Sequence, residues 1–217
     1  MKREISKGFY LVIEGPDGGG KTTQYNLLAD KLSEEFDVLR VKEPGATKFG
    51  AKIRAMLLDP SYDSLAPLTE VFLFSADRRH TLENVVMPAL AEGKLVISDR
   101  NYYSTEAYQS AGGGVDIGEV RKISALATAG VDHNLAVILD IDSETGLRRA
   151  RGVSEIKDKI EARGLEYHKK VRDAYLEIAK RDSGVCVVID ASKSINAIHE
   201  ELYRVSKERI YKVLKSP

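Results

Sequence analysis

The sequence contains a single cysteine and no long apolar run, and both absences narrow the class of protein. The lone Cys186 excludes an internal disulfide framework and fits a reducing compartment. It stands in the apolar run 185–189, where we expect a buried strand thiol rather than a nucleophile. No stretch approaches the ~20 apolar residues that a membrane span needs, and the charged segment 1–7 has no apolar signal-peptide core behind it. We therefore expect a soluble, cytoplasmic protein with no membrane partner.

The chain also lacks net charge, because 33 lysines and arginines balance 33 aspartates and glutamates. This balance gives no general attraction to nucleic acids or membrane surfaces, so no nucleic-acid partner is expected. The 217 residues are enough for a substantial core, and no repeat, low-complexity tract or linker divides them. We expect one domain, residues 1–217.

A glycine-rich segment between an apolar run and a helical pattern carries the clearest chemical signal. Residues 9–13 have the length and composition of a buried strand, and Gly15-x-x-x-x-Gly20-Lys21-Thr22 follows at once. In such a loop the backbone N–H groups form an anion site at a helix N-terminus. Lys21 can reach terminal phosphates, and the Thr22 hydroxyl can bind Mg²⁺. The candidate nucleotide-binding residues are Gly15, Pro16, Asp17, Gly18, Gly19, Gly20, Lys21, Thr22 and Thr23.

Apolar runs and the helical segments between them predict the fold class. The expected strands are residues 9–13, 38–42, 95–98, 135–141 and 185–190. Each is a continuous apolar run, as in parallel strands that are covered on both faces. The alternation of strand and helix predicts an α/β fold, a five-stranded parallel sheet with helices on both faces.

Besides the helix that follows the phosphate loop, five more helices are predicted from spacing. Residues 67–91 form the longest, with an apolar stripe wide enough to leave a face for a partner subunit, and Pro88 is expected to kink or end it. The charge-rich stretch 143–163 reads as a solvated helix, and Gly112–Gly114 as a mobile loop. The other predicted helices are 47–58, 165–180 and 195–214.

Several polar residues lie where an open α/β sheet binds its ligands, at the carboxyl ends of strands. Asp99 and Arg100 follow the third predicted strand, where a phosphate and Mg²⁺ would lie. Phe74 and Arg78 are four apart on one helix face, which suits a base and its phosphate. Asp17 lies inside the phosphate loop, a costly place for a carboxylate unless it meets Mg²⁺ or a substrate hydroxyl.

Four segments in order along the chain resemble the thymidylate kinases, a family of nucleoside monophosphate kinases with a phosphate-binding loop. They are Ile-Glu-Gly-Pro-Asp-Gly-Gly-Gly-Lys-Thr-Thr (13–23), Lys-Glu-Pro-Gly-Ala-Thr (42–47), Leu-Phe-Ser-Ala-Asp-Arg (73–78), and Asp-Arg with Ser-Thr-Glu-Ala-Tyr-Gln (99–109). The resemblance implies ATP-dependent phosphorylation of dTMP to dTDP in dTTP biosynthesis, with Mg²⁺ as cofactor. It also implies a homodimer, formed through the long helix.

The resemblance further implies roles for the acceptor residues. Phe74 would stack on thymine, and Arg78 and Arg100 would hold the acceptor phosphate. Tyr108 would lie under the deoxyribose and exclude a 2′-hydroxyl. The remaining implied roles place Thr105 and Gln109 near the base, Asp17 at the 3′-hydroxyl or the metal shell, and Asp99 at Mg²⁺ or the transferring phosphate.

Family members supply a transition-state arginine from the phosphate loop or from a lid over ATP. Because Gly18 and Gly19 occupy the loop positions here, the lid version is implied, with the lid at about residues 143–163. Its candidates are Arg148, Arg149 and Arg151, and spacing does not decide between them; Arg149 and Arg151 are taken as the catalytic candidates with Lys21, Asp17, Asp99 and Arg100.

The chain departs from the family pattern at Lys42 (usually Arg), Ala46 (usually Gly) and Asn101 (usually Tyr or His), and residues 112–114 lack a basic residue. These departures leave open a second interpretation, another pyrimidine nucleoside monophosphate kinase with relaxed base selectivity. A non-catalytic nucleotide-binding relative also stays open. A nucleotide-dependent switch protein is disfavoured because no Asn-Lys-x-Asp tetrapeptide occurs.

Overall fold

The computed structural model describes residues 5, 8–59, 65–153 and 163–215, apart from the side chains of residues 151–153 and 215. In these residues five strands form one parallel sheet in the order β2-β3-β1-β4-β5. The strands are β1 (Phe9–Glu14), β2 (Val38–Lys42), β3 (Leu95–Asp99), β4 (Leu135–Asp140) and β5 (Cys186–Asp190). The prediction of five parallel strands is confirmed.

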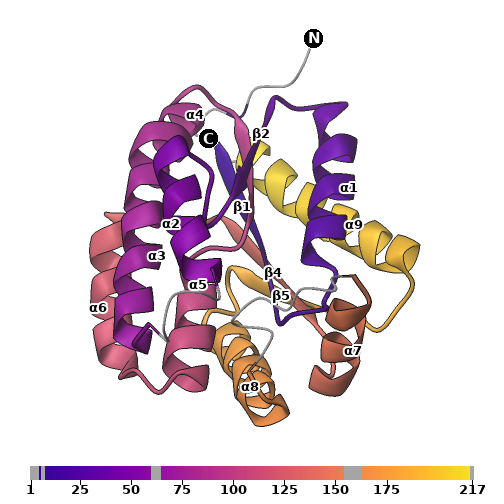
Figure 1. Ribbon diagram of the computed structural model, residues 1–217. Helices are drawn as coiled ribbons and strands as arrows, with labels where there is room; N and C mark the ends of the chain where they lie inside the picture. The colour runs from indigo at the N-terminus through magenta and orange to yellow at the C-terminus, as the bar shows by residue number, and fades with distance from the viewer. Residues whose placement is uncertain (1–4, 6–7, 60–64, 154–162, 216–217) are drawn as a thin grey trace.

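Successive residues of β1 point into different hydrophobic cores, because side chains alternate across a strand. Phe9, Leu11 and Ile13 belong to a core that α1 (Lys21–Ser33) and α9 (Ile195–Lys215) complete. Tyr10 and Val12 belong to a core on the other face, beneath Leu82 and Val86 of the long helix. Figure 1 shows α1 and α9 on one side of the sheet and the long helix on the other, so helices cover both faces as predicted.

A third core lies beside β4 and supports the substrate side of the molecule. It joins Ala136 and Ile138 of β4 to Tyr103, Tyr108 and Tyr175. The three tyrosines come from α5 (Tyr102–Thr105), the π-helical segment η2 (Glu106–Gly112) and α8 (Leu165–Arg181). The remaining helical elements are α2 (Lys48–Leu58), α3 (Pro67–Thr81), η1 (Leu82–Val86), α4 (Met87–Ala91), α6 (Ile117–Thr128) and α7 (Ser143–Val153).

The long predicted helix is present, but Pro88 does not end it. The chain is helical from Pro67 to Ala91, with the π-helical turn η1 immediately before Met87 and Pro88. A proline removes one backbone donor inside a helix, and a wider π turn accommodates such a defect. The helix ends at Ala91, and Gly93 turns the chain with φ 75°. A Cβ at Gly93 would lie 2.9 Å from the Ile5 carbonyl oxygen, so this turn requires glycine.

Three further expectations need correction around the substrate side. Gly112 is the last residue of η2, so the predicted loop at 112–114 is a loop only after that residue. The helix predicted over 143–163 is described as α7 to Val153, and Arg163 lies in a bend before α8; the part over residues 154–162 lies outside the described residues. Helices α5, η2 and α6 were not predicted. In η2 the buried residues are the consecutive Glu106, Ala107, Tyr108 and Gln109, half of them polar, so the segment lacks the apolar spacing that indicates a helix.

Across the described part of the chain, no helix combines the length and apolar character that crossing a membrane requires.

Candidate active site

A cavity of about 900 Å³ opens where the phosphate loop meets α3 and η2. The strand register places Asp99 of β3 level with Ile13 of β1 and Lys42 of β2, so the ends of these three strands contribute to one edge. The cavity brings together most predicted site residues: Asp17, Gly18, Gly19, Gly20, Lys21, Thr22, Thr23, Phe74, Arg78, Asp99, Arg100, Thr105, Tyr108, Gln109 and Arg149. Gly15 and Pro16 are not among the residues that line it, and the Arg151 side chain lies outside the described residues.

Close backbone contacts fix the shape of the phosphate loop. Gly15 has φ 134°, and a Cβ there would lie 2.5 Å from the Leu139 carbonyl oxygen. A Cβ on Gly18 would lie 2.0 Å from the Gly146 carbonyl oxygen of α7. Gly20 adopts φ 80° at the start of α1, where its left-handed conformation turns the chain into the helix. The loop is therefore held between the end of β4 and the first turns of α7.

Lys21 is folded into the loop that it follows. Its Nζ donates a hydrogen bond to the Pro16 carbonyl oxygen at 2.7 Å and lies 3.9 Å from Asp17 Oδ1. Burial, together with the nearby positive charge of Arg100, lowers the pKa of Lys21 to about 8, although Asp17 and Asp99 oppose this shift. The ammonium is thus a poorly compensated buried charge, and a bound phosphate would stabilise it.

Thr22 and Asp99 bring two side-chain oxygens together beside the loop. Thr22 Oγ1 donates to Asp99 Oδ2 at 3.0 Å, and Lys42 Nζ lies 3.9 Å from the same oxygen. A hydroxyl and a carboxylate are the ligand types that a hard cation such as Mg²⁺ takes. The described residues contain no group of three or more His, Cys, Asp or Glu side chains suited to a metal. A cation here would complete its shell with water and substrate phosphate.

Arg100 connects the end of β3 to the phosphate loop. Its Nη2 donates to Asp17 Oδ1 at 2.8 Å, and its Nη1 donates to Ser104 Oγ at 3.1 Å. Its guanidinium also lies over the Tyr108 ring, 5.1 Å from the ring centre. Burial favours the neutral form of Asp17, but the charges of Arg100 and Lys21 outweigh it and hold the pKa of Asp17 below its usual value. Asp17 and Arg100 are thus an ion pair at the mouth of the loop.

The other side of the cavity carries Phe74 and Arg78 of α3. Arg78 is buried; its Nε donates to Glu43 Oε2 at 2.9 Å and its Nη2 to Thr105 Oγ1 at 3.2 Å. Arg78 Nη1 and Glu43 Oε1 have no hydrogen-bond partner among the described residues. Burial raises the pKa of Glu43 to about 7, with Arg78 opposing the shift. Two unsatisfied polar atoms at a cavity wall leave hydrogen-bonding capacity for a ligand.

Gln109 belongs to a hydrogen-bond network that reaches Arg163, two residues before α8. Its Nε2 donates to Glu70 Oε2 at 3.1 Å, and Arg163 Nη2 donates to Glu70 Oε1 at 2.8 Å. Tyr167 Oη donates to the Tyr108 carbonyl oxygen at 2.9 Å. Through these contacts η2, α3 and the start of α8 hold the Tyr108 and Gln109 positions together.

The predicted lid arginines occupy different surroundings. Arg149 lines the cavity, where its Nη1 donates to the Ala191 carbonyl oxygen at 2.7 Å and its Nη2 to that of Ser192 at 3.4 Å. It therefore faces the segment after β5. Arg148 also lines the cavity, and both side chains are exposed; they differ in their partners, because Arg148 Nη2 lies 3.5 Å from Thr145 Oγ1.

Sequence reasoning missed Glu14, which organises the segment after Arg100. Glu14 is fully buried and accepts four hydrogen bonds, from the backbone N–H groups of Asn101 (2.8 Å) and Ser104 (3.2 Å), from Ser104 Oγ (2.7 Å) and from Tyr175 Oη (2.8 Å). A carboxylate that ends an apolar strand directly before Gly15 was the available signal. Its partners Asn101, Ser104 and Tyr175 are distant in sequence and could not be read from spacing.

A glycine-rich loop between a strand and a helix N-terminus, followed by Lys and Thr at the edge of a parallel sheet, defines a P-loop nucleotide-binding protein. The cavity wall opposite the loop, which carries Phe74 and Arg78, and the strand order β2-β3-β1-β4-β5 are those of the nucleoside monophosphate kinase form of that fold. The solved thymidylate kinase of Ehrlichia chaffeensis is similar over 92% of this chain and 98% of its own, with a TM-score of 0.77 and 32% identity.

The comparisons with sequences agree. The thymidylate kinase family model matches residues 13–202. Thymidylate kinase of Sulfurihydrogenibium sp. (strain YO3AOP1) is 40% identical over 203 residues, covering 93% of this chain and 98% of its own. That of Pelotomaculum thermopropionicum is 40% identical over 210 residues, covering 96% and 97%. The chain belongs to the thymidylate kinase family, as its sequence motifs predicted.

Proposed function

We propose that this protein is a thymidylate kinase that transfers the terminal phosphoryl group of ATP to dTMP, giving ADP and dTDP. The observation that carries the proposal is one cavity with a phosphate loop on one wall and an aromatic ring, two arginines and two amide or hydroxyl side chains on the other. Such a transfer needs donor and acceptor phosphates held in line, with their charge neutralised and water excluded.

On the donor side, the loop backbone and Lys21 bind the phosphates of ATP. Thr22 and Asp99 would hold Mg²⁺, which when bound would neutralise charge at the transferring group. Asp99 also accepts the Thr22 hydrogen bond in the free protein, which keeps the two oxygens 3.0 Å apart. We further propose that the protein acts in the cytoplasm, a reducing compartment that its single cysteine fits.

On the acceptor side, Arg100 and Arg78 bind the dTMP phosphate, and Phe74 stacks on the base. Thr105 and Gln109 lie near the base, and Asp17 near the 3′-hydroxyl. Tyr108 lies beneath Arg100 in the wall of the cavity, where a ring under the sugar leaves no room for a 2′-hydroxyl. The unpartnered Nη1 of Arg78 is a donor that the acceptor nucleotide satisfies.

The transition-state arginine comes from α7, since the loop positions 18 and 19 are glycines. Arg149 and Arg151 are its candidates. To reach the phosphates, Arg149 must leave two carbonyl oxygens of the segment after β5. Those same contacts support a second role for Arg149, in which it holds the donor nucleotide from the side of that segment.

The protein is proposed to act as a homodimer through the face formed by α2, α3 and α6, which Figure 1 shows side by side. Apolar side chains are exposed there: Leu126 of α6 is 77% exposed and Phe72 of α3 is 55% exposed, with Leu68, Phe49 and Met56 nearby in the same helices. Large exposed apolar side chains that gather on one face are typical of a surface that another chain covers.

The test is a coupled assay of ADP release with ATP, Mg²⁺ and dTMP on the wild type and two Arg100 variants. Arg100→Gln removes the charge-assisted contact with the acceptor phosphate, so kcat/KM for dTMP falls about 10- to 100-fold. Arg100→Lys keeps the charge but loses the two-pronged guanidinium, so kcat/KM for dTMP falls less than in Arg100→Gln. KM for ATP stays within about twofold in both variants. A wild type without turnover, or an Arg100→Gln variant that is fully active on dTMP, contradicts the proposal.

A further inference from the structure

Arg100 has a backbone conformation that needs outside support. Its φ is 77°, in the left-handed region that side chains with a Cβ rarely adopt. The backbone N–H donates to the Ile13 carbonyl oxygen at 3.0 Å, and the Arg100 carbonyl oxygen accepts from Ser98 Oγ at 2.7 Å. The following residue, Asn101, is also held, because its N–H donates to Glu14. The direction of the Arg100 side chain thus depends on how residues 98–101 are fixed.

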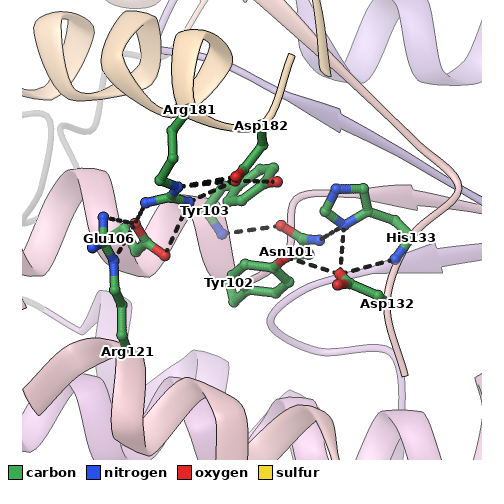
Figure 2. Close-up of polar contacts among 9 residues, drawn as sticks. All are labelled: Asn101, Tyr102, Tyr103, Glu106, Arg121, Asp132, His133, Arg181 and Asp182. Carbon is green, nitrogen blue, oxygen red and sulfur yellow. Dashed lines mark hydrogen bonds and ion pairs between the residues drawn. The ribbon is translucent and has the colours of Figure 1, made fainter. Parts of the chain in front are cut away.

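Asn101 ties that segment to a loop that does not line the cavity. Its side chain is buried; Oδ1 accepts from the Tyr103 N–H at 3.0 Å and so caps α5. The other end of the amide, Nδ2, lies 3.0 Å from His133 Nδ1. His133 is buried in the loop before β4, and its ring packs against Tyr103 at 4.9 Å between ring centres. Figure 2 shows the imidazole and the amide facing each other, with Tyr102 and Asp132 beside them.

The chemistry of the pair fixes both groups. The Tyr103 N–H can only donate, so the amide must present its oxygen there and its NH₂ to His133. His133 Nδ1 must then be the acceptor, which places the imidazole proton on Nε2. A flipped Asn101 amide would place its NH₂ against the Tyr103 N–H, two donors facing each other. A proton on His133 Nδ1 would likewise face the Asn101 NH₂. The pair therefore has one arrangement that satisfies both the Tyr103 N–H and the Asn101 amide. In it the protonated Nε2 of His133 has no hydrogen-bond partner among the described residues, and Asp132 Oδ1 lies 3.5 Å from Nδ1.

We propose that His133 is a positioning residue for the acceptor site, acting through Asn101 to hold Arg100 toward Asp17 and to cap the helix that carries Thr105 and Tyr108. This inference rests on the proposed function. The amide–imidazole contact thus joins the segment after Arg100 to the loop before β4. Removing the acceptor at His133 frees the Asn101 amide to turn and weakens the hold on Arg100.

The experiment compares three variants with the wild type by steady-state kinetics on dTMP and on ATP. His133→Leu fills the space without an acceptor, and kcat/KM for dTMP is expected to fall about tenfold, mainly through KM. His133→Gln offers an amide oxygen to Asn101 and is expected to recover to within about threefold of the wild type. KM for ATP is expected to stay within about twofold throughout. The matched control, Tyr102→Phe, removes a hydrogen bond to Asp132 from the same cluster and is expected to leave both constants unchanged.

A measurement on the unmodified protein covers the case in which His133→Leu does not fold. A long-range ¹H–¹⁵N spectrum at pH 7 is expected to show His133 with a bare Nδ1 and a protonated Nε2, its signals identified by their loss in His133→Gln. A protonated Nδ1 overturns the inference. So does a His133→Leu variant that leaves KM for dTMP and KM for ATP unchanged, or that changes both equally. Absence of wild-type turnover on dTMP refutes the proposed function and the inference with it, whereas an active wild type with an unaffected His133→Leu refutes the inference alone.

Discussion

Glu14→Gln is the substitution that most directly tests how the acceptor side is built. Glu14 is fully buried at the end of β1, and its two oxygens accept two hydrogen bonds each. Oε1 receives the backbone N–H groups of Asn101 and Ser104, which can only donate. Oε2 receives the hydroxyls of Ser104 and Tyr175, which can turn and accept. Glutamine keeps the shape of the side chain but replaces one acceptor with a donor.

The expected cost follows from that division. The glutamine oxygen must face the two N–H groups, and its NH₂ then faces the hydroxyls, so four bonds survive in neutral form. A hydrogen bond to a charged group contributes about 1.5–3 kcal/mol and a neutral one about 0.5–1.5. Part of the difference is returned because an amide costs less to bury than a carboxylate. The net loss in the free energy of unfolding is about 2–3 kcal/mol, or about 4–12 °C in Tm for a chain of this size.

Urea and thermal unfolding followed by circular dichroism measure this loss, with dTMP titrated into each protein by calorimetry. Tyr175→Phe is the matched comparison, since it removes one of the four donors and keeps the ring; its expected cost is about 1 kcal/mol. Because both variants loosen the segment after Arg100, dTMP affinity should fall while ATP affinity holds. A Glu14→Gln protein as stable as the wild type would refute the reasoning, since the four donors would then not depend on a carboxylate.

Two further predictions concern Lys21 and the exposed apolar face. The pKa of Lys21 is about 8 in the free protein, and bound phosphates raise it, so above pH 8 the complex holds one more proton than the free enzyme. ATP affinity should therefore fall up to tenfold per pH unit above about 8. Calorimetry at pH 8.5 in buffers of different ionisation enthalpy should show that ATP binding takes up protons. An ATP affinity that does not change with pH, without proton uptake, contradicts this prediction. Leu126→Glu should convert the proposed dimer to a folded monomer in sedimentation, whereas Leu27→Glu, at an exposed position of α1, should not. A wild type that sediments as a monomer, or a Leu126→Glu variant that stays dimeric, rejects that interface.

The parts of the molecule that could be predicted are those in which one stretch of sequence decides the structure. Continuous apolar runs mark strands that are covered on both faces. The conformation of the loop from Gly15 to Thr22 is set by its own glycines. The π geometry of η1 was missed because the apolar spacing that predicted the long helix does not distinguish a π turn from an α turn. The segment η2 was missed because half of its buried residues are polar. In both places packing overrides the local pattern.

The contacts that support the site depend on residues far apart in sequence. Glu14 and Tyr175 are 161 positions apart, and Asn101 and His133 are 32 apart. No periodicity links such residues, and a buried carboxylate or imidazole becomes recognisable only when the fold shows what surrounds it. The sequence therefore predicted the residues that line the cavity well, and the residues that hold them poorly.

The central claim is tested most directly by turnover of a panel of acceptors at equal concentration with ATP and Mg²⁺: dTMP, dUMP, dCMP, dGMP, dAMP, UMP and CMP. We expect dTMP to be the best acceptor and UMP a poor one, because in the proposed site Phe74 would stack on the base and Tyr108 would exclude the 2′-hydroxyl. Comparable rates with several bases, or with UMP and dUMP, would contradict the assignment of these two side chains. No turnover with any acceptor would contradict the assignment of the cavity itself.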